Sequence, residues 1–196
     1  MSFRGLLQEF ASRYPDARKE PFRGHEVSIL MRKTIAAEIE ASGLFESDQY
    51  KVSGSVGKGG WAEIPWVAVY KLSETDTLHH GFFIVYVFSA DLSNLYLTVN
   101  QGSVLYFETH TRAETNAHIR GSSDAVIANM DSGGFASGPI DLGTKSNVGR
   151  FLENGCMFSL EYDVASLPTD DIMFSDLKKA KELYLEALDT KARLSL

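Results

Sequence analysis

A glycine-rich loop set between strand-like runs constrains the fold of this chain more than any other feature. The loop Gly54–Gly60 holds four glycines in seven residues and follows the short β-prone run Tyr50–Ser53. Three further β-prone runs come after it: Ile64–Leu72, Phe82–Ser89 and Leu95–Val99. β-Branched and aromatic residues favour strands, and clustered glycines mark tight turns. The block therefore predicts an antiparallel meander with an exposed loop at one end.

Helical periodicity on both sides of this block predicts flanking helices. The expected helices cover residues 3–14, 24–42, 104–129 and about 169–192. Pro15 is expected to stop the first helix and Gly43 the second. Two more strands are expected at 135–142 and 151–162, with a polar loop at 143–150. These elements predict one α+β domain over residues 1–196, in which helices flank a curved, mostly antiparallel sheet.

Composition bears on partners and on the cellular compartment. The net charge is −7, whereas nucleic-acid binders are usually basic overall, so any DNA contact requires positive charge concentrated on one face. Cys156 is the one cysteine, which excludes a disulfide or a cysteine-based zinc site within the chain and fits a reducing cytoplasm. The N-terminus does not resemble a signal peptide, and no apolar run approaches the ~20 residues of a membrane span.

Two motifs in the chain suggest a phosphate site and a metal site, but the positions of their residues do not fit either one. A phosphate-binding Walker A loop ending at Lys58 needs a glycine where Val52 stands and a Ser or Thr where Gly59 stands. The adjacent His79 and His80 point to opposite faces if the segment is extended, which disfavours a shared metal. The glycines of the loop then either relieve backbone strain or let the backbone approach a partner while Lys58 projects from the tip.

A search for catalytic sets finds none. The Gly-x-Ser-x-Gly motif is missing, Cys156 has no defined histidine partner, and Asp170-Asp171 fits the charge at a helix start. The sequence therefore predicts a binding module with no cofactor, no metal and no active site of its own. The alternatives left open are a small nuclease with an unrecognised site and a protein-interaction or oligomerisation domain.

Aromatic residues gather around the glycine-rich loop. Trp61, Trp66, Phe82 and Phe83 all lie in the loop-and-strand block, and Trp61 fits best as a core residue. Trp66 follows Pro65 at a strand entry, where a large ring can line a pocket. An aromatic pocket beside a lysine-tipped loop suits a base that has been extruded from DNA, because rings stack on the base and a loop residue enters the gap.

The block resembles the MrcB-like N-terminal domain family, the DNA-binding domain of McrB-type modified-cytosine restriction systems. The resemblance rests on Gly57, Gly59, Trp61, Ile64-Pro65-Trp66, Gly81-Phe82-Phe83 with the run to Phe88, Leu95-Tyr96-Leu97 and Asn100-Gln101-Gly102, and it continues weakly to Tyr184. It implies recognition of a methylated cytosine by base flipping, in partnership with a GTPase motor or nuclease in another domain or subunit.

The resemblance also assigns roles to residues. Matched position by position, the walls of the base pocket fall on Trp66 and Phe83, with Val87 as a further pocket residue. The loop residue that fills the vacated place in the duplex falls on Lys58. Phe83 stands where the best-known member has a tyrosine, and Lys58 where it has an aromatic wedge. A hydroxyl contact and a stacking contact are therefore lost, and a phosphate contact is gained.

A local basic patch must offset the acidic net charge if the chain binds DNA. The expected contact loop is Gly57, Lys58, Gly59 and Gly60, joined by Lys51 and by Lys71 from the neighbouring strands.

Overall fold

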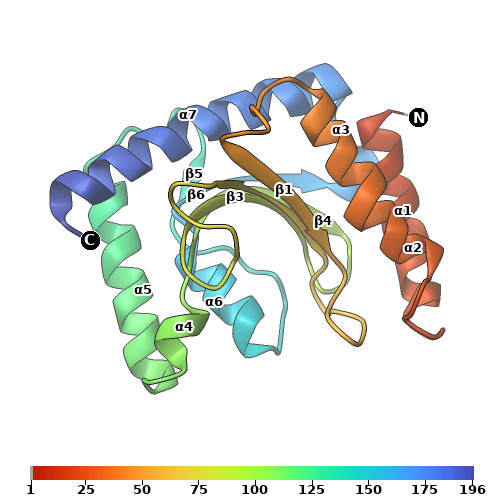
Figure 1. Ribbon diagram of the computed structural model, residues 1–196, viewed down its shortest axis with the longest axis horizontal. Helices are drawn as coiled ribbons and strands as arrows, with labels where there is room; N and C mark the ends of the chain where they lie inside the picture. Colours follow the sequence, from red (N-terminus) through yellow and green to blue (C-terminus); the bar gives the residue numbers. More distant parts are fainter. Residues whose placement is uncertain (1) are drawn as a thin grey trace.

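The computed structural model describes residues 2–196 and centres on a six-stranded antiparallel sheet. The strands are β1 (Tyr50–Ser55), β2 (Trp66–Lys71), β3 (Gly81–Phe88), β4 (Asn94–Gly102), β5 (Ala136–Ser137) and β6 (Phe158–Asp163). Their order is β1-β2-β3-β4-β6-β5. The first four strands form the predicted meander, and β6 pairs with β4 after a long excursion of the chain. The sheet bends into an arch (Figure 1), which confirms the predicted α+β fold with a curved sheet.

Helices lie on both sides of the arch (Figure 1). They are α1 (Phe3–Ala17), α2 (Glu26–Ile29), a π-helical segment (Leu30–Ile35), α3 (Ala36–Ala41), α4 (Val104–Phe107), α5 (Arg112–Ile127), α6 (Asn147–Gly155) and α7 (Asp170–Leu194), with a 3₁₀ turn at Val164–Ser166. Helices α1 and α7 cover the convex face, and α6 lies inside the arch. Among residues 2–196, no helix is both long and apolar enough to cross a bilayer.

The two faces of the sheet bury separate apolar clusters because side chains alternate along each strand. On the convex face, Tyr86 meets Phe3 of α1 edge to face, with ring centroids 5.7 Å apart. On the concave face, Phe83 and Val85 share a cluster with Leu152 of α6. At the start of α7, the Asp170 carboxylate accepts hydrogen bonds from the Phe3 and Arg4 amides of α1, at 2.9 and 2.8 Å.

The first two helices differ in detail from the sequence expectation. Helix α1 continues through Pro15 to Ala17, because a proline so near the end removes few hydrogen bonds and the Arg18 amide still reaches the Tyr14 carbonyl at 3.0 Å. The second helix contains a π-helical turn, which packs against β1. At that contact a Cβ on Gly54 would lie 2.3 Å from the Met31 carbonyl oxygen, so the close approach requires glycine.

The helix expected over residues 104–129 is two helices. Thr111 breaks it by forming a capping box with Glu114, in which each side chain bonds the backbone of the other residue. Thr111 is therefore the N-cap of a separate helix, α5, which follows the short α4. The small residues Gly121 and Ser123 do not interrupt α5, and Ser123 is buried in it.

The largest error of the sequence expectation lies between residues 135 and 162. The strand expected at 135–142 is reduced to β5, and the region expected as a loop and a strand start contains α6. Ser146 caps α6 by accepting a hydrogen bond from the Gly149 amide at 3.0 Å. At its other end, a Cβ on Gly155 would lie 2.5 Å from the Gln101 carbonyl oxygen, so this end packs tightly onto β4.

Candidate nucleic-acid interface

The glycine-rich loop connects the paired ends of β1 and β2, where Ser55 lies opposite Trp66. Gly57 adopts a φ of +114°, and a Cβ there would lie 1.9 Å from the Gly60 carbonyl oxygen. The Ala62 amide closes the loop onto the Val56 carbonyl at 2.7 Å. The turn therefore requires glycine at position 57 and leaves Lys58, Gly59 and Gly60 exposed.

Trp61 fixes the loop to the helices behind it. Its indole N–H donates to the Glu20 carbonyl at 2.9 Å, and its ring meets those of Tyr14, Phe22 and His25 edge to face. The Tyr14 hydroxyl donates to the Ala62 carbonyl at 2.9 Å, and burial raises the pKa of Tyr14 to about 12. Trp61 thus packs partly buried against the core, in keeping with its expected structural role.

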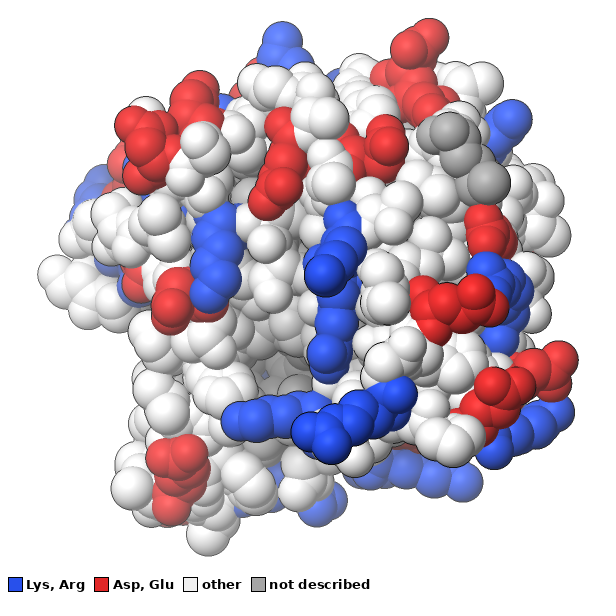
Figure 2. Space-filling model, turned by 45° about the vertical axis from the view of Figure 1, so that its right-hand side comes forward, with Lys and Arg blue, Asp and Glu red and all other residues white. Residues whose placement is uncertain are grey.

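Arginines from the neighbouring helical region lie at the base of the loop. The Arg32 guanidinium donates to the Gly57 carbonyl and lies 5.4 Å from the Phe22 ring centroid. Arg23, Arg32 and Gly59 line a surface hollow of about 510 Å³. On the side of the molecule turned forward in Figure 2, lysine and arginine side chains gather around a hollow. The sequence carries no signal for this role of Arg32, because no spacing relates it to a loop residue 25 positions away.

The other two expected lysines lie away from the loop. Lys51 pairs with Tyr70 and Lys71 with Tyr50, at the end of β1 opposite the loop. Four residues separate Lys51 from Ser55, which is about 13 Å along a strand. Lys51 bonds the Asp76 carbonyl at 3.1 Å and lies 3.6 Å from its carboxylate. The structure therefore groups Lys58 with Arg23 and Arg32 and not with Lys51 or Lys71.

Trp66 lies at the rim of the concave face, in one row with Val87 and Tyr96. Val87 pairs with Trp66 on one side and with Tyr96 on the other. Val87 is fully buried, Tyr96 is 6% exposed and Trp66 is partly exposed. Burial, followed by a hydrogen bond to Glu161, raises the pKa of Tyr96 to about 12. Tyr96 lies within the Leu95-Tyr96-Leu97 match but was not predicted as a pocket residue.

Phe83 lies deeper in the same face. It is four residues from Val87 along β3, or about 13 Å, so Trp66 and Phe83 are not placed on either side of one base. Its ring is fully buried and meets the Tyr70 ring edge to face at 6.0 Å. Helix α6 covers this end of the face, since the side-chain amide of Asn100, opposite Phe83, donates to the Leu152 carbonyl at 3.0 Å.

Glu63 links the loop to α6. Its carboxylate accepts hydrogen bonds from the Thr144 hydroxyl at 2.6 Å and from the Lys145 and Ser146 amides at 3.0 and 3.2 Å. The Thr144 hydrogen bond is the main cause of a lowered pKa for this carboxyl group. Because Glu63 stands three residues before Trp66, the start of α6 is held close to the β2 entry, beside the open part of the concave face.

The family comparison agrees with this arrangement. A family model described as the MrcB-like, N-terminal domain matches residues 9–189, nearly the whole chain. The chain belongs to this family. Membership of this family makes the chain a DNA-binding domain of the McrB-like type, as the resemblance in the loop and strand block implied. No curated protein matches the sequence.

Within residues 2–196 of this MrcB-like domain, no three His, Cys, Asp or Glu side chains come together in a way that could hold a metal ion. His79 and His80 are both exposed in the turn before β3. His110 and His118 stack on either side of Tyr106, at centroid distances of 3.8 and 4.1 Å.

Proposed function

We propose that this domain recognises methylated cytosine in double-stranded DNA by base flipping, as the target-reading module of a modification-dependent restriction system. The observation that supports the proposal best is the arrangement at the β1–β2 junction. There an exposed lysine-tipped loop backed by Arg32 adjoins the partly exposed ring of Trp66. Base flipping needs cations for the phosphates and a ring for the extruded base, and both lie here within one hairpin.

The proposed base site is the row formed by Trp66, Val87 and Tyr96. The backbones of β2 and β4 lie two strand spacings apart, about 9.5 Å, and the inward curve of the sheet brings their concave side chains closer. A base stacked on the exposed part of Trp66 would lie at the edge of this row, with the buried side chains of Val87 and Tyr96 behind it. Phe83 packs deeper in the same face and supports this row from within the core. Because it is not a tyrosine, it brings no hydroxyl group to the site.

Methyl recognition in such a pocket depends mainly on shape. Burying one methyl group contributes at most about 0.8 kcal/mol, whereas stacking contributes roughly 1–3 kcal/mol per base. The domain therefore gains most of its affinity for the flipped base from Trp66, and its preference for the modified base from how the pocket fits it.

The deciding experiment compares two duplexes that differ only in cytosine methylation, titrated by fluorescence anisotropy. A second pair carries 2-aminopurine next to the target cytosine, because loss of stacking raises its fluorescence when the base is extruded. We expect tighter binding and brighter 2-aminopurine with the methylated duplex. Equal affinity for both duplexes, with no rise in fluorescence, would refute recognition by flipping.

We further propose that the domain does not cut DNA, and that a GTPase motor or nuclease in another domain or subunit performs cleavage. Incubation of the purified domain with methylated supercoiled plasmid, with and without Mg²⁺, tests this. Conversion of the plasmid to nicked or linear DNA would identify a nuclease instead.

A protein-interaction domain is the second candidate, and the net charge of −7 favours it. The duplex titration separates the two candidates, since an interaction domain has no reason to distinguish methylated from plain DNA.

A further inference from the structure

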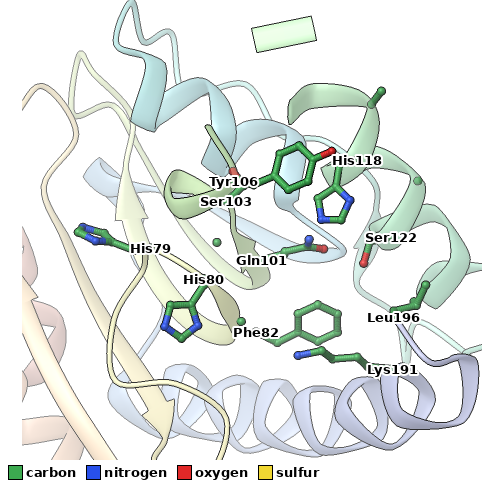
Figure 3. Close-up of a pocket in the computed structure, with 14 residues that line it drawn as sticks. His79, His80, Phe82, Gln101, Ser103, Tyr106, His118, Ser122, Lys191 and Leu196 are labelled. Carbon is green, nitrogen blue, oxygen red and sulfur yellow. The ribbon is translucent and has the colours of Figure 1, made fainter. Parts of the chain in front are cut away.

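A second cavity lies at the other end of the sheet and on its other face (Figure 3). It has a volume of about 480 Å³, is open to solvent, and is lined by the turn before β3, the end of β4, helices α4 and α5, and the C-terminal end of α7. Its inner wall includes Phe82 and Gln101, which pair across β3 and β4. Phe82 belongs to the convex apolar cluster, so this cavity is separate from the concave row that contains Trp66.

Two buried polar side chains in the cavity wall each carry an oxygen that lacks a hydrogen-bond partner among the described residues. Gln101 is 7% exposed and Ser103 is 3% exposed. The Gln101 Oε1 and the Ser103 Oγ have no hydrogen-bond partner within residues 2–196. Figure 3 shows the Gln101 amide directed into the cavity, with Tyr106 and His118 on one side and Phe82 and Lys191 on the other. Buried polar groups are nearly always paired in proteins, so these two point to a bound partner that supplies hydrogen bonds.

The chemistry of the wall selects a planar ligand with a mixed hydrogen-bonding edge. A glutamine amide offers one acceptor and two donors in a plane, which matches the N6 amino group and N7 of adenine. The surrounding rings suit a flat heterocycle, since Tyr106 and His118 are parallel within 4° at 4.1 Å and Phe82 lines the opposite side. The volume accommodates one nucleoside.

The charge of the site limits what can be attached to the base. Lys191 lies 4.9 Å from the Phe82 ring centroid and is ion-paired with Glu74. Because that carboxylate offsets the lysine, the site offers little positive charge for a polyphosphate. A nucleoside, a monophosphate or a nucleotide within a strand fits this balance better than a triphosphate does.

We propose that this cavity binds an adenine base. Gln101 reads the N6 and N7 edge, Ser103 supplies a further hydrogen bond, and the Tyr106–His118 stack and Phe82 flank the ring. The base comes either from a free adenine nucleotide or from an unpaired adenine in a nucleic-acid strand. This site does not depend on the base pocket at Trp66 and stands whether or not the domain reads methylcytosine.

Isothermal titration calorimetry with four probes tests the proposal: adenosine monophosphate, guanosine monophosphate, inorganic phosphate and a single-stranded oligo(dA). We expect saturable binding of adenosine monophosphate, at least tenfold weaker binding of guanosine monophosphate, and no binding of phosphate. Tighter binding of oligo(dA) than of the monophosphate assigns the site to a strand, and the reverse assigns it to a free nucleotide. No saturation by either adenine probe up to millimolar concentration, or equal binding by phosphate, would overturn the proposal.

Variants locate the binding within the cavity. Gln101→Leu should lose at least tenfold in adenine affinity while its thermal midpoint stays equal or rises, because the variant removes an unpaired buried polar group. A structural glutamine would instead show a lowered midpoint with unchanged affinity, which would contradict the assignment. Ser103→Ala provides a second, smaller change with an expected loss of affinity. Glu40→Gln, at an exposed site on α3 away from the cavity, is the control and should bind adenine like the parent.

Discussion

At the scale of single residues, Trp66 and Phe83 separate two roles that the sequence had assigned together. Both belong to the aromatic block, and the resemblance placed both as walls of one pocket. The strand register sets them about 13 Å apart and leaves only Trp66 partly exposed. A ring at the rim can contact a ligand, whereas a fully buried ring acts first on stability.

Trp66→Ala is expected to weaken binding of the methylated duplex about tenfold, or about 1.4 kcal/mol, because one stacking contact is lost. Binding of the plain duplex, which depends on phosphate contacts, should change little. Anisotropy titrations of the two duplexes measure both effects, with Leu72→Ala, an exposed residue just after the far end of β2, as a control. A folded Trp66→Ala variant with the parent's preference for methylated DNA would remove Trp66 from the base site.

Phe83→Ala serves as the contrasting variant. Because its ring is fully buried, truncation should lower the free energy of unfolding by about 3–5 kcal/mol. Urea denaturation measures this loss, and DNA binding is compared only under conditions where the variant is folded.

Lys58 and Lys51 form a matched pair for the electrostatic contribution. Lys58→Ala is expected to weaken methylated and plain duplexes together and to reduce the slope of log affinity against log salt by about 0.9, the value for one phosphate contact. Lys51→Ala should leave that slope unchanged, because Lys51 lies at the other end of β1 beside Asp76. Affinities measured over a series of salt concentrations give these slopes. Equal slopes for Lys58→Ala and Lys51→Ala would place the glycine-rich loop outside the DNA interface.

At the scale of elements, the glycine-rich loop owes its shape to one position. Gly57→Ala would place a Cβ 1.9 Å from the Gly60 carbonyl oxygen in a left-handed conformation that costs about 1–2 kcal/mol in itself. We expect a lower thermal midpoint and loss of affinity for both duplexes. Gly60→Ala is the control, since nothing lies within 4 Å of its Cβ position. Identical midpoints and affinities for both variants would show that the loop tolerates rearrangement.

The Glu63 contact with the start of α6 should make the fold sensitive to acid. Its pKa is lowered from the usual 4.5, so its stabilising effect is present above that value and is lost as the pH falls through the lower folded value. Thermal midpoints of the parent and Glu63→Gln from pH 7 to pH 3 should therefore converge at low pH. Glu40→Gln, at an exposed site on α3, provides the comparison. A constant difference between parent and Glu63→Gln would exclude this contribution.

At the scale of the whole molecule, the meander of the sheet could be predicted from the sequence. Helix α6 and the contributions of Arg32 and Tyr96 to the candidate site could not. The meander from β1 to β4 is made of local pairings, which turn residues and strand composition reveal. Helix α6 escaped prediction because its cap, Ser146, stands in a polar, turn-rich stretch and its apolar residues continue into those of β6. Arg32 and Tyr96 join the candidate site through strand register and helix packing, which depend on contacts between distant segments.

The pairing of β6 with β4 has a consequence for how such domains diversify. Residues 103–157 separate β4 from its partner β6, carry α4, α5 and α6, and add only the short edge strand β5 to the sheet. The strands that hold Trp66, Val87 and Tyr96 are complete before this excursion begins. Substitutions, insertions or whole replacements in the excursion can therefore remodel one side of the concave opening while the row beneath it keeps its register. Exchanging this segment between related domains would transfer the shape of the opening without redesigning the sheet.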